Sequence, residues 1–273
     1  MRIAVIGHVE HVTIARAAAL PRAGDIVHLD GPVVIAGGGG GIAFFQLTMG
    51  DAELHLFTAI GLDEAGTHVH HEITGAGATV HAALRQQPHT RDIVVITPDG
   101  ERTIFVVGEP LHPQRDDRLS WDLLASCDAA YFTGQDPETL LAARQARLLV
   151  VTARRREALA RSGVQADVVV GSAHDPREAS ALAVYAVPPR ALVITEGAAG
   201  GYIETSDGRQ RFAAPAPPAR IAGAYGAGDS FAGALTWYLA RGLAIDDACA
   251  RAAEHGAAVL RGINPLEHQL PLS

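Results

Sequence analysis

Cysteine is almost absent from this chain of 273 residues, because Cys127 and Cys249 are the only two. Two cysteines so far apart cannot build a disulfide framework or a zinc cluster, so we expect two buried thiols in a reducing compartment. Basic residues are also few, with 22 Lys and Arg against 30 Asp and Glu and a formal charge of -8. Without a basic run to neutralise phosphates, nucleic acid and anionic membrane surfaces are not expected partners.

Long apolar runs are missing as well. No uncharged stretch approaches the ~20 residues that a membrane helix needs. Residues 2–7 already have the composition of a buried first strand, so we expect no signal peptide and a cytoplasmic location. His68, His70 and His71 invite a metal hypothesis, but their spacing does not put two ligands on one helical face. Surface positions on a helix are the favoured interpretation of these three residues.

Short apolar runs alternate with helical patterns along most of the sequence, which predicts βαβ units and a mainly parallel sheet. We expect one domain over residues 1–273. Buried strands are predicted at 2–7, 54–60, 128–133, 147–152, 167–171 and 191–196. Helices are predicted near 40–49, 63–75, 136–146, 154–162, 175–186, 229–241 and 246–262.

Two segments interrupt this alternation. Residues 25–36 and 91–107 have the pattern of antiparallel strands, and Pro98-Asp99-Gly100 marks a hairpin turn in the second. Strands inserted at about 8–36 and 88–108 would form a small separate sheet. A lid over a cleft is the favoured interpretation, because phosphoryl transfer requires that water be kept out. A decorative edge or a dimer surface is the alternative, and exposed edges suit a homodimer through this sheet.

The strongest chemical signal is a glycine turn before the predicted helix at 229–241. Gly226, Ala227 and Gly228 precede Asp229, so the unpaired N–H groups of the helix can bind an anion. Asp229 could take a proton from a hydroxyl that attacks the bound phosphate. We expect the helix end to lower the pKa of Asp229. An ordinary N-cap is the structural alternative.

A run of five glycines precedes the predicted helix at 40–49. Glycines at a helix start let a ligand approach the backbone closely, so we expect substrate contacts there. The alternatives are a flexible loop or a dinucleotide-binding turn, and the latter is weak because no core strand precedes the run. The residues concerned are Gly37, Gly38, Gly39, Gly40 and Gly41.

The hexapeptide Gly226–Phe231, GAGDSF, resembles the C-terminal signature of the ribokinase (PfkB) family of carbohydrate kinases. The resemblance extends over nearly the whole chain, through the segments 2–7, 36–41, 100–104 and 193–200. It implies a ribokinase-like three-layer α/β sandwich with a β-sheet lid. It also implies transfer of the ATP γ-phosphate, with Mg²⁺, to an alcohol group of a sugar-like molecule (EC 2.7.1.-). Asp229 would then be the base, and Gly226, Ala227 and Gly228 the anion hole.

The resemblance assigns further residues. The family's usual acidic residue for sugar hydroxyls is not in its common place after the first strand, and Glu10 is the nearest carboxylate able to do that job. Glu178 lies in a segment similar to the Asn-x-x-Glu motif that orders magnesium water, with Asp175 in place of the Asn. Acidic residues are common in the first turn of a helix, which would explain Glu178 nearly as well. The residues that the resemblance assigns to ATP have structural alternatives too, namely a simple turn after a strand or close packing between helices. Those residues are Thr195, Gly197, Gly200, Gly226, Gly228, His255 and Ala258.

Two further positions depart from the family pattern. Gly223-Ala224 occupies the place of an Asp-Thr pair that helps to hold a monovalent cation, which speaks against potassium activation. Gly40-Gly41-Ile42 replaces a usual Asn, so a typical ribokinase substrate set is not expected. We therefore expect an ATP-dependent sugar or polyol kinase. A nucleoside kinase of the same fold and a sugar sensor without turnover are the alternatives; aromatic content of 5% favours a plain sugar, and intact Asp229 favours an enzyme.

Overall fold

The computed structural model describes all residues, 1–273, and its centre is a nine-stranded sheet. Strands β11 to β5 run parallel, and two antiparallel strands, β12 and β13, extend one edge. The sheet order is β13-β12-β11-β10-β9-β8-β1-β4-β5, where β1 spans Arg2–Ile6, β4 Glu53–Gly61, β5 Thr79–Arg85, β8 Ala129–Phe132, β9 Leu148–Thr152, β10 Val168–Ser172, β11 Ala191–Thr195, β12 Gly201–Thr205 and β13 Gly208–Phe212.

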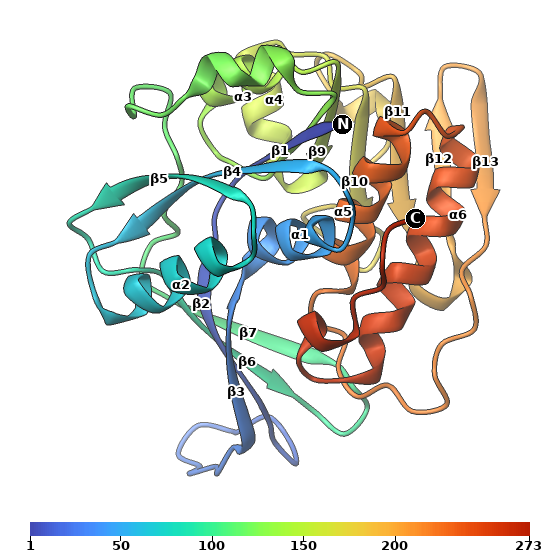
Figure 1. Cartoon of the computed structure of the whole chain (residues 1–273). Coiled ribbons are helices and arrows are strands. Elements are labelled where there is room, and N and C mark those ends of the chain that lie inside the picture. Colours follow the sequence, from blue (N-terminus) through green and yellow to red (C-terminus); the bar gives the residue numbers. More distant parts are fainter.

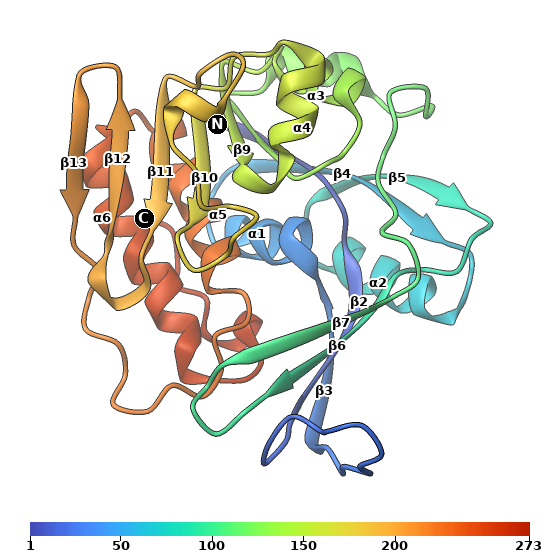
Figure 2. The same cartoon turned by 180° about the vertical axis from the view of Figure 1, so that it is seen from behind.

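Helices cover both faces of this sheet, as Figures 1 and 2 show from opposite sides. Alternate residues of each strand point to opposite faces, so Ile3 and Val5 of β1 join one core and Ala4 and Ile6 join the other. The first core packs against α1 (Gly38–Thr48), α2 (Glu64–Gly75), α5 (Ala227–Ala240) and α6 (Ile245–Ala258). The second packs against α3 (Pro137–Ala143) and α4 (Arg156–Ser162). The predicted three-layer sandwich is confirmed.

A separate four-stranded sheet extends below the sandwich in Figure 1 and has the order β3-β2-β6-β7. Its strands are β2 (Glu10–Arg16), β3 (Asp30–Gly37), β6 (Arg91–Ile96) and β7 (Arg102–Val107). Two antiparallel hairpins, β2–β3 and β6–β7, join through parallel pairing of β2 with β6. We call this sheet the lid sheet. The hairpin turn predicted at Pro98-Asp99-Gly100 is present, because Gly100 N–H donates to Thr97 O at 2.8 Å.

The helix predicted at 175–186 is wrong. Only a single turn forms, in which Glu178 and Ala179 donate to the carbonyl of Asp175 at 2.9 and 2.8 Å, and a short 3₁₀ segment follows at Leu182–Val184. The Ser180 hydroxyl lies 3.0 Å from both Glu178 O and Tyr185 Oη, and such local bonds compete with a helical ladder. Strands β5, β12 and β13 were not predicted, because their residues alternate or are exposed instead of forming buried apolar runs.

The predicted buried thiols are confirmed, since Cys127 and Cys249 are both buried and free. None of the helices combines the length and apolar character that crossing a membrane demands. His70 and His71 are exposed on α2 and His68 is half-buried there, as expected for residues of a surface helix. The cytoplasmic location stays a prediction.

Candidate active site

Helix α5 begins with an uncapped turn. Its N-cap is Gly226, which has φ +82° and no side chain to occupy the first N–H groups of the helix. A Cβ at this position would also lie 2.9 Å from Pro265 and 3.0 Å from Ile42. Both the positive φ and the lack of space for a side chain therefore require glycine in this turn. Gly228 faces open space, and Asp229 follows it in the first turn. The helix end therefore presents free donors beside a carboxylate.

The five-glycine run leads directly into α1 and meets this helix end. Gly38 N–H donates to the hydroxyl of Tyr225 at 3.0 Å, a bond that joins residues 187 positions apart in sequence. Gly38 has φ +76°, and a Cβ there would lie 2.7 Å from Glu10 Oε2. A Cβ on Gly39 would lie 3.1 Å from Asp229 Oδ1. Glu10, the glycine run and Asp229 thus converge on one point, as the sequence predicts.

Protein atoms crowd the carboxylate of Asp229, and this burial raises its pKa, while the charges of Arg154 and Arg102 act in the opposite direction. The expected lowering by the helix end is therefore wrong, because desolvation outweighs the favourable charges. A raised pKa brings a carboxylate closer to the operating pH, which improves it as a proton acceptor.

The inner face of the lid sheet contributes further polar groups. Directly opposed residues of an antiparallel pair share a face, and the register pairs Arg102 with Ile96 and Val106 with Asp92. Ile96 and Asp92 are buried toward the sandwich at 1% and 4% exposure, so Arg102 lies on that inner face. Its influence on the Asp229 pKa agrees with this position.

Glu10 and Asp92 form a buried carboxyl pair at the base of the lid sheet. Both are less than a tenth exposed. Burial raises the pKa of Glu10 well above its usual range, and the neighbouring Asp92 charge and hydrogen bond raise it further. Burial also raises the pKa of Asp92, which the hydrogen bond from Glu10 partly offsets. The pair therefore shares one proton, because burial and the repulsion between two carboxylates disfavour the doubly ionised state.

A pH-dependent stability follows from this pair. Raised carboxyl pKa values stabilise the fold at low pH, and that contribution is lost as pH rises through the folded-state pKa. Asp92→Asn keeps an acceptor for Glu10 and removes one charge. We expect the variant to gain about 2–4 °C in Tm relative to wild type at pH 8, the shift that ~1 kcal/mol produces, and less at pH 5. Exposed Asp122→Asn is the control; an equal difference for Asp92→Asn at both pH values would contradict the shared proton.

Glu178 lies against Arg154. Its Oε1 accepts from Arg154 Nε at 2.5 Å, and Asp175 holds another nitrogen of the same guanidinium. Burial raises the pKa of Glu178, and the Asp229 charge raises it further, so the two carboxylates lie near each other. Glu178 Oε2 accepts no bond from the chain, which leaves it open to a cation or its water. This arrangement fits one ligand of a Mg²⁺ ion whose other ligands come from phosphates and water.

The residues assigned to ATP do not all lie on an open surface. Thr195 is the last residue of β11, and its hydroxyl donates a hydrogen bond to Gly171 O. Gly197 follows it and is exposed near His174. A Cβ on Gly200 would lie 2.1 Å from a strand carbonyl, so packing explains that glycine. His255 is 2% exposed and its Nε2 lies 3.1 Å from the Tyr238 hydroxyl. His255 and the buried Ala258 belong to the packing between α5 and α6.

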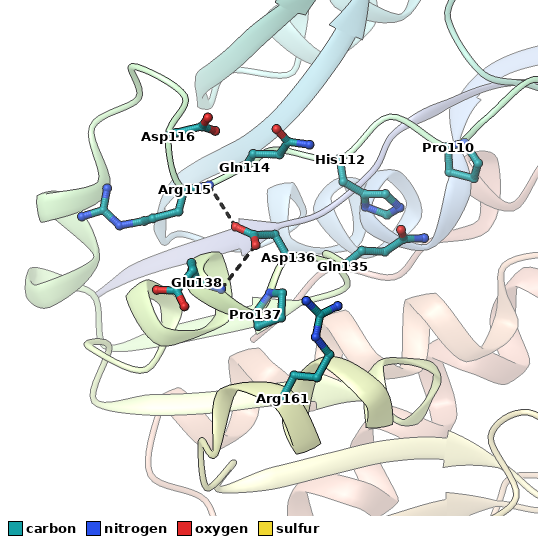
Figure 3. A pocket seen from close by; sticks show the side chains of 10 residues that line it. All are labelled: Pro110, His112, Gln114, Arg115, Asp116, Gln135, Asp136, Pro137, Glu138 and Arg161. Atoms are coloured by element: carbon teal, nitrogen blue, oxygen red, sulfur yellow. Dashed lines mark hydrogen bonds between the residues drawn. The ribbon is translucent and has the colours of Figure 1, made fainter.

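A polar pocket of about 500 Å³ adjoins this cleft, and no hydrophobic residue lines it (Figure 3). His112, from the loop after β7, is one of its lining residues and packs edge-on against His8 with ring centroids 5.0 Å apart. His8 in turn lies 3.7 Å from the Cβ position of Gly39 and 3.8 Å from Glu10. The pocket is thereby linked through two imidazoles to the point where the predicted site residues meet.

Several residues of the site were not predicted. Asp92 and Tyr225 could be found only from the register of the lid sheet and the packing of its inner face, and that register also places Arg102, for which the sequence left a phosphate contact and a solvent-exposed position open. Arg154 and Arg155 follow β9, and the carboxyl ends of parallel strands carry ligand sites, so their position was the available signal. His8 and His112 lack any motif.

Comparisons with known proteins identify the family of this chain. The sequence pattern of the pfkB family carbohydrate kinases matches residues 1–268. The chain belongs to this family. Its general role is therefore that of a carbohydrate or nucleoside kinase, a phosphotransferase. No curated protein matches the sequence.

Solved structures share the ribokinase-like fold at low sequence identity. Ribokinase from Thermotoga maritima is 16% identical with a TM-score of 0.79, over 99% of this chain and 96% of that one. Adenosine kinase from Sinorhizobium meliloti is 18% identical with a TM-score of 0.78, over 100% and 96%. Arabidopsis thaliana ribokinase in complex with ribose and ATP is 14% identical with a TM-score of 0.74, over 98% and 95%.

Proposed function

We propose that this pfkB family member is an ATP-dependent kinase that phosphorylates a hydroxyl group of a sugar or polyol. One observation carries the proposal: the Asp229 carboxylate, in the first turn of an uncapped helix, lies 3.1 Å from the Cβ position of Gly39 in the glycine run. A proton acceptor, free N–H donors and a surface without side chains therefore share one point. An acceptor hydroxyl and a transferring phosphate need these three elements together.

In the proposed reaction Asp229 accepts the proton of the attacking hydroxyl. The N–H groups of Ala227 and Gly228 stabilise negative charge on the transferring phosphate. Arg154 and Arg102, whose charges already act on Asp229, flank the same position. Closure of the lid sheet would exclude water from the reacting groups.

Nucleotide binding is proposed for the end of the cleft beside β11. Thr195 and Gly197 stand at the carboxyl end of a parallel strand, where ligands bind in open α/β sheets. The Arabidopsis thaliana ribokinase solved with ribose and ATP supports ATP as the donor. Mg²⁺ would neutralise the nucleotide phosphates when bound, and Glu178 Oε2 would hold the ion or its water.

The acceptor is proposed to lie between Gly38–Gly39 and Glu10, under the inner face of the lid sheet. The shared proton is engaged between Glu10 and Asp92, so the remaining carboxyl oxygens of the pair would accept hydrogen bonds from hydroxyls of the acceptor. The rings near this position are those of His8 and His112. Phe44 is fully buried instead, which favours a sugar over a nucleoside, although an adenosine kinase shares the fold. Gly223 and Ala224 supply no carboxylate for a monovalent cation.

ADP release in the presence of Mg²⁺ and a panel of pentoses, hexoses, polyols, acidic sugars and nucleosides tests this function. We expect acceptor-dependent ADP release with at least one non-nucleoside. Acceptor-induced thermal stabilisation without any ADP release would favour the sensor instead. Turnover with nucleosides alone would establish the nucleoside kinase.

The outer face of the lid sheet supports a homodimer as a further part of the proposal. Val34, Ile93 and Phe105 lie in one cross-strand row, with Thr13 between the first two, and are 42%, 38% and 46% exposed. An apolar row on a sheet suits burial against a second copy. Phe105→Glu should convert a dimer into a monomer in sedimentation velocity, whereas Val184→Glu, at a 53% exposed position outside the lid sheet, should not. A monomeric wild-type protein would contradict this arrangement.

A further inference from the structure

Arg155 is a cation of the cleft that no carboxylate neutralises. Its neighbour Arg154 is paired with Asp175 and Glu178. Arg155 forms no ion pair: its Nε donates to Thr133 O at 2.7 Å, and its two Nη atoms donate to no acceptor of the chain. Burial and the Arg154 charge lower its pKa to about 10, which leaves it positive at neutral pH. A half-buried guanidinium with free donors is suited to bind an anion.

Contacts place Arg155 on the acceptor side of the cleft. Thr133, which receives its Nε–H, has its hydroxyl 3.4 Å from Nδ1 of His8. His8 packs against His112 and lies beside Gly39. The Arg155 charge accordingly lowers the pKa of both histidines, after burial as the larger cause for each.

Asp229 lies under the influence of other cations. Arg154 and Arg102 are the charges that lower its pKa, and Arg155 is not among them. The phosphoryl-transfer end of the cleft therefore has its own two arginines.

His112 has a ring without hydrogen-bond partners. The residue is 8% exposed, and both ring nitrogens are buried with no partner in the chain. It lines the pocket of about 500 Å³, where Arg161 extends from α4 toward Gln135 and His112 (Figure 3). A buried imidazole without partners is unfavourable unless a ligand supplies them.

The carboxylates that line this pocket are not placed to repel an anion bound at His112. Asp136 is engaged as the N-cap of α3 and accepts bonds from the backbone N–H groups of Arg115, Glu138 and Thr139. Asp116 and Glu138 lie at the other end of the pocket from His112 (Figure 3). The end beside His112 thus carries donors and cations.

We propose that the acceptor is an anionic sugar, whose carboxylate or phosphate group binds Arg155 on the side of the cleft where His8 packs against the His112 ring. This inference rests on the proposed kinase function and names its substrate class. The hydroxyl to be phosphorylated lies at Asp229, and the anionic group lies at the opposite end of the molecule, beyond His8. Carboxylate and phosphate share the chemistry that a guanidinium recognises.

Calorimetric titration of the full-length protein without ATP tests this subsite with matched probes. D-gluconate is compared with D-glucitol, and D-fructose 6-phosphate with D-fructose, so that the two arms separate a carboxylate from a phosphate. We expect one anionic probe to bind about 10- to 100-fold more tightly than its neutral partner, the value of hydrogen bonds to a charged group. Arg155→Gln should abolish that preference, and Arg155→Lys should retain part of it.

Arg156→Gln is the matched control, because it removes the same charge one residue away, from a side chain that bonds no group of the cleft. It should keep the wild-type preference. Equal binding of neutral and anionic probes by the wild type, or no binding of either anionic probe, would overturn the inference without recourse to a variant. Equal weakening of both partners by Arg155→Gln would also overturn it. ADP release is scored separately, so release with neutral sugars alone refutes the anionic class and leaves the kinase function standing.

Discussion

Asp229→Asn is expected to lower kcat by about 10²- to 10⁴-fold, the usual contribution of a general base. The amide keeps the shape of the side chain and cannot accept the proton of the acceptor hydroxyl. It also removes a charge whose burial is unfavourable, as the raised pKa of Asp229 shows. Thermal stability should therefore stay equal or rise, and the KM for ATP should change little. Steady-state kinetics with the accepted sugar and a thermal melt measure both.

Asp246→Asn is the matched control for this variant. Asp246 also stands in the first turn of a helix, α6, but it is exposed. Loss of a generic helix–dipole interaction would affect both variants alike. A comparable loss of kcat in Asp246→Asn, or full activity in Asp229→Asn, would contradict the role of Asp229 as the base.

Gly39→Ala is expected to lower kcat/KM for the acceptor by about 10²-fold, because a displacement of roughly 1 Å in a reacting pair can have that effect. The added Cβ would lie 3.1 Å from Asp229 Oδ1 and 3.7 Å from His8 Cε1, in the space assigned to the acceptor. It meets no backbone atom, and Gly39 does not have a positive φ, so the fold should tolerate the change. Binding of ATP should remain near the wild-type value.

Gly75→Ala provides the control for a glycine-to-alanine change on a helix. Gly75 ends α2, and nothing lies within 4 Å of its Cβ position. Alanine there should leave kinetics unchanged and stability equal or slightly higher. If Gly39→Ala retained wild-type kcat/KM for every acceptor, the glycine run would not be the acceptor surface.

Much of the sandwich could be predicted because its parallel strands are buried on both faces. Such strands are continuous apolar runs, and β1, β4 and β8 to β11 all have this pattern. The edge hairpin of β12 and β13 lacked it, since most of β13 is exposed. The segment 175–186 has helix-forming residues, but Asp175 and Ser180 form local bonds that end the turn. Propensity does not reveal such competition.

The parts of the site that could be predicted from the sequence are those where the backbone conformation requires glycine. Gly226 and Gly38 adopt positive φ values, and both were identified from glycine patterns. Tertiary structure was needed for the rest: Asp92 meets Glu10 through strand register, and Arg155 meets His8 through Thr133. The pKa of Asp229 depends on how many atoms surround it, which the sequence of the turn does not specify.

The pH dependence of kcat tests the central claim most directly, when wild type and Asp229→Asn are measured with saturating ATP, Mg²⁺ and acceptor. Because burial raises the pKa of Asp229, wild-type kcat should fall as the pH is lowered through that value, above the range of a free aspartate. The residual rate of Asp229→Asn should lack this acidic limb. A variant that keeps both the rate and the limb of the wild type would show that another group takes the proton.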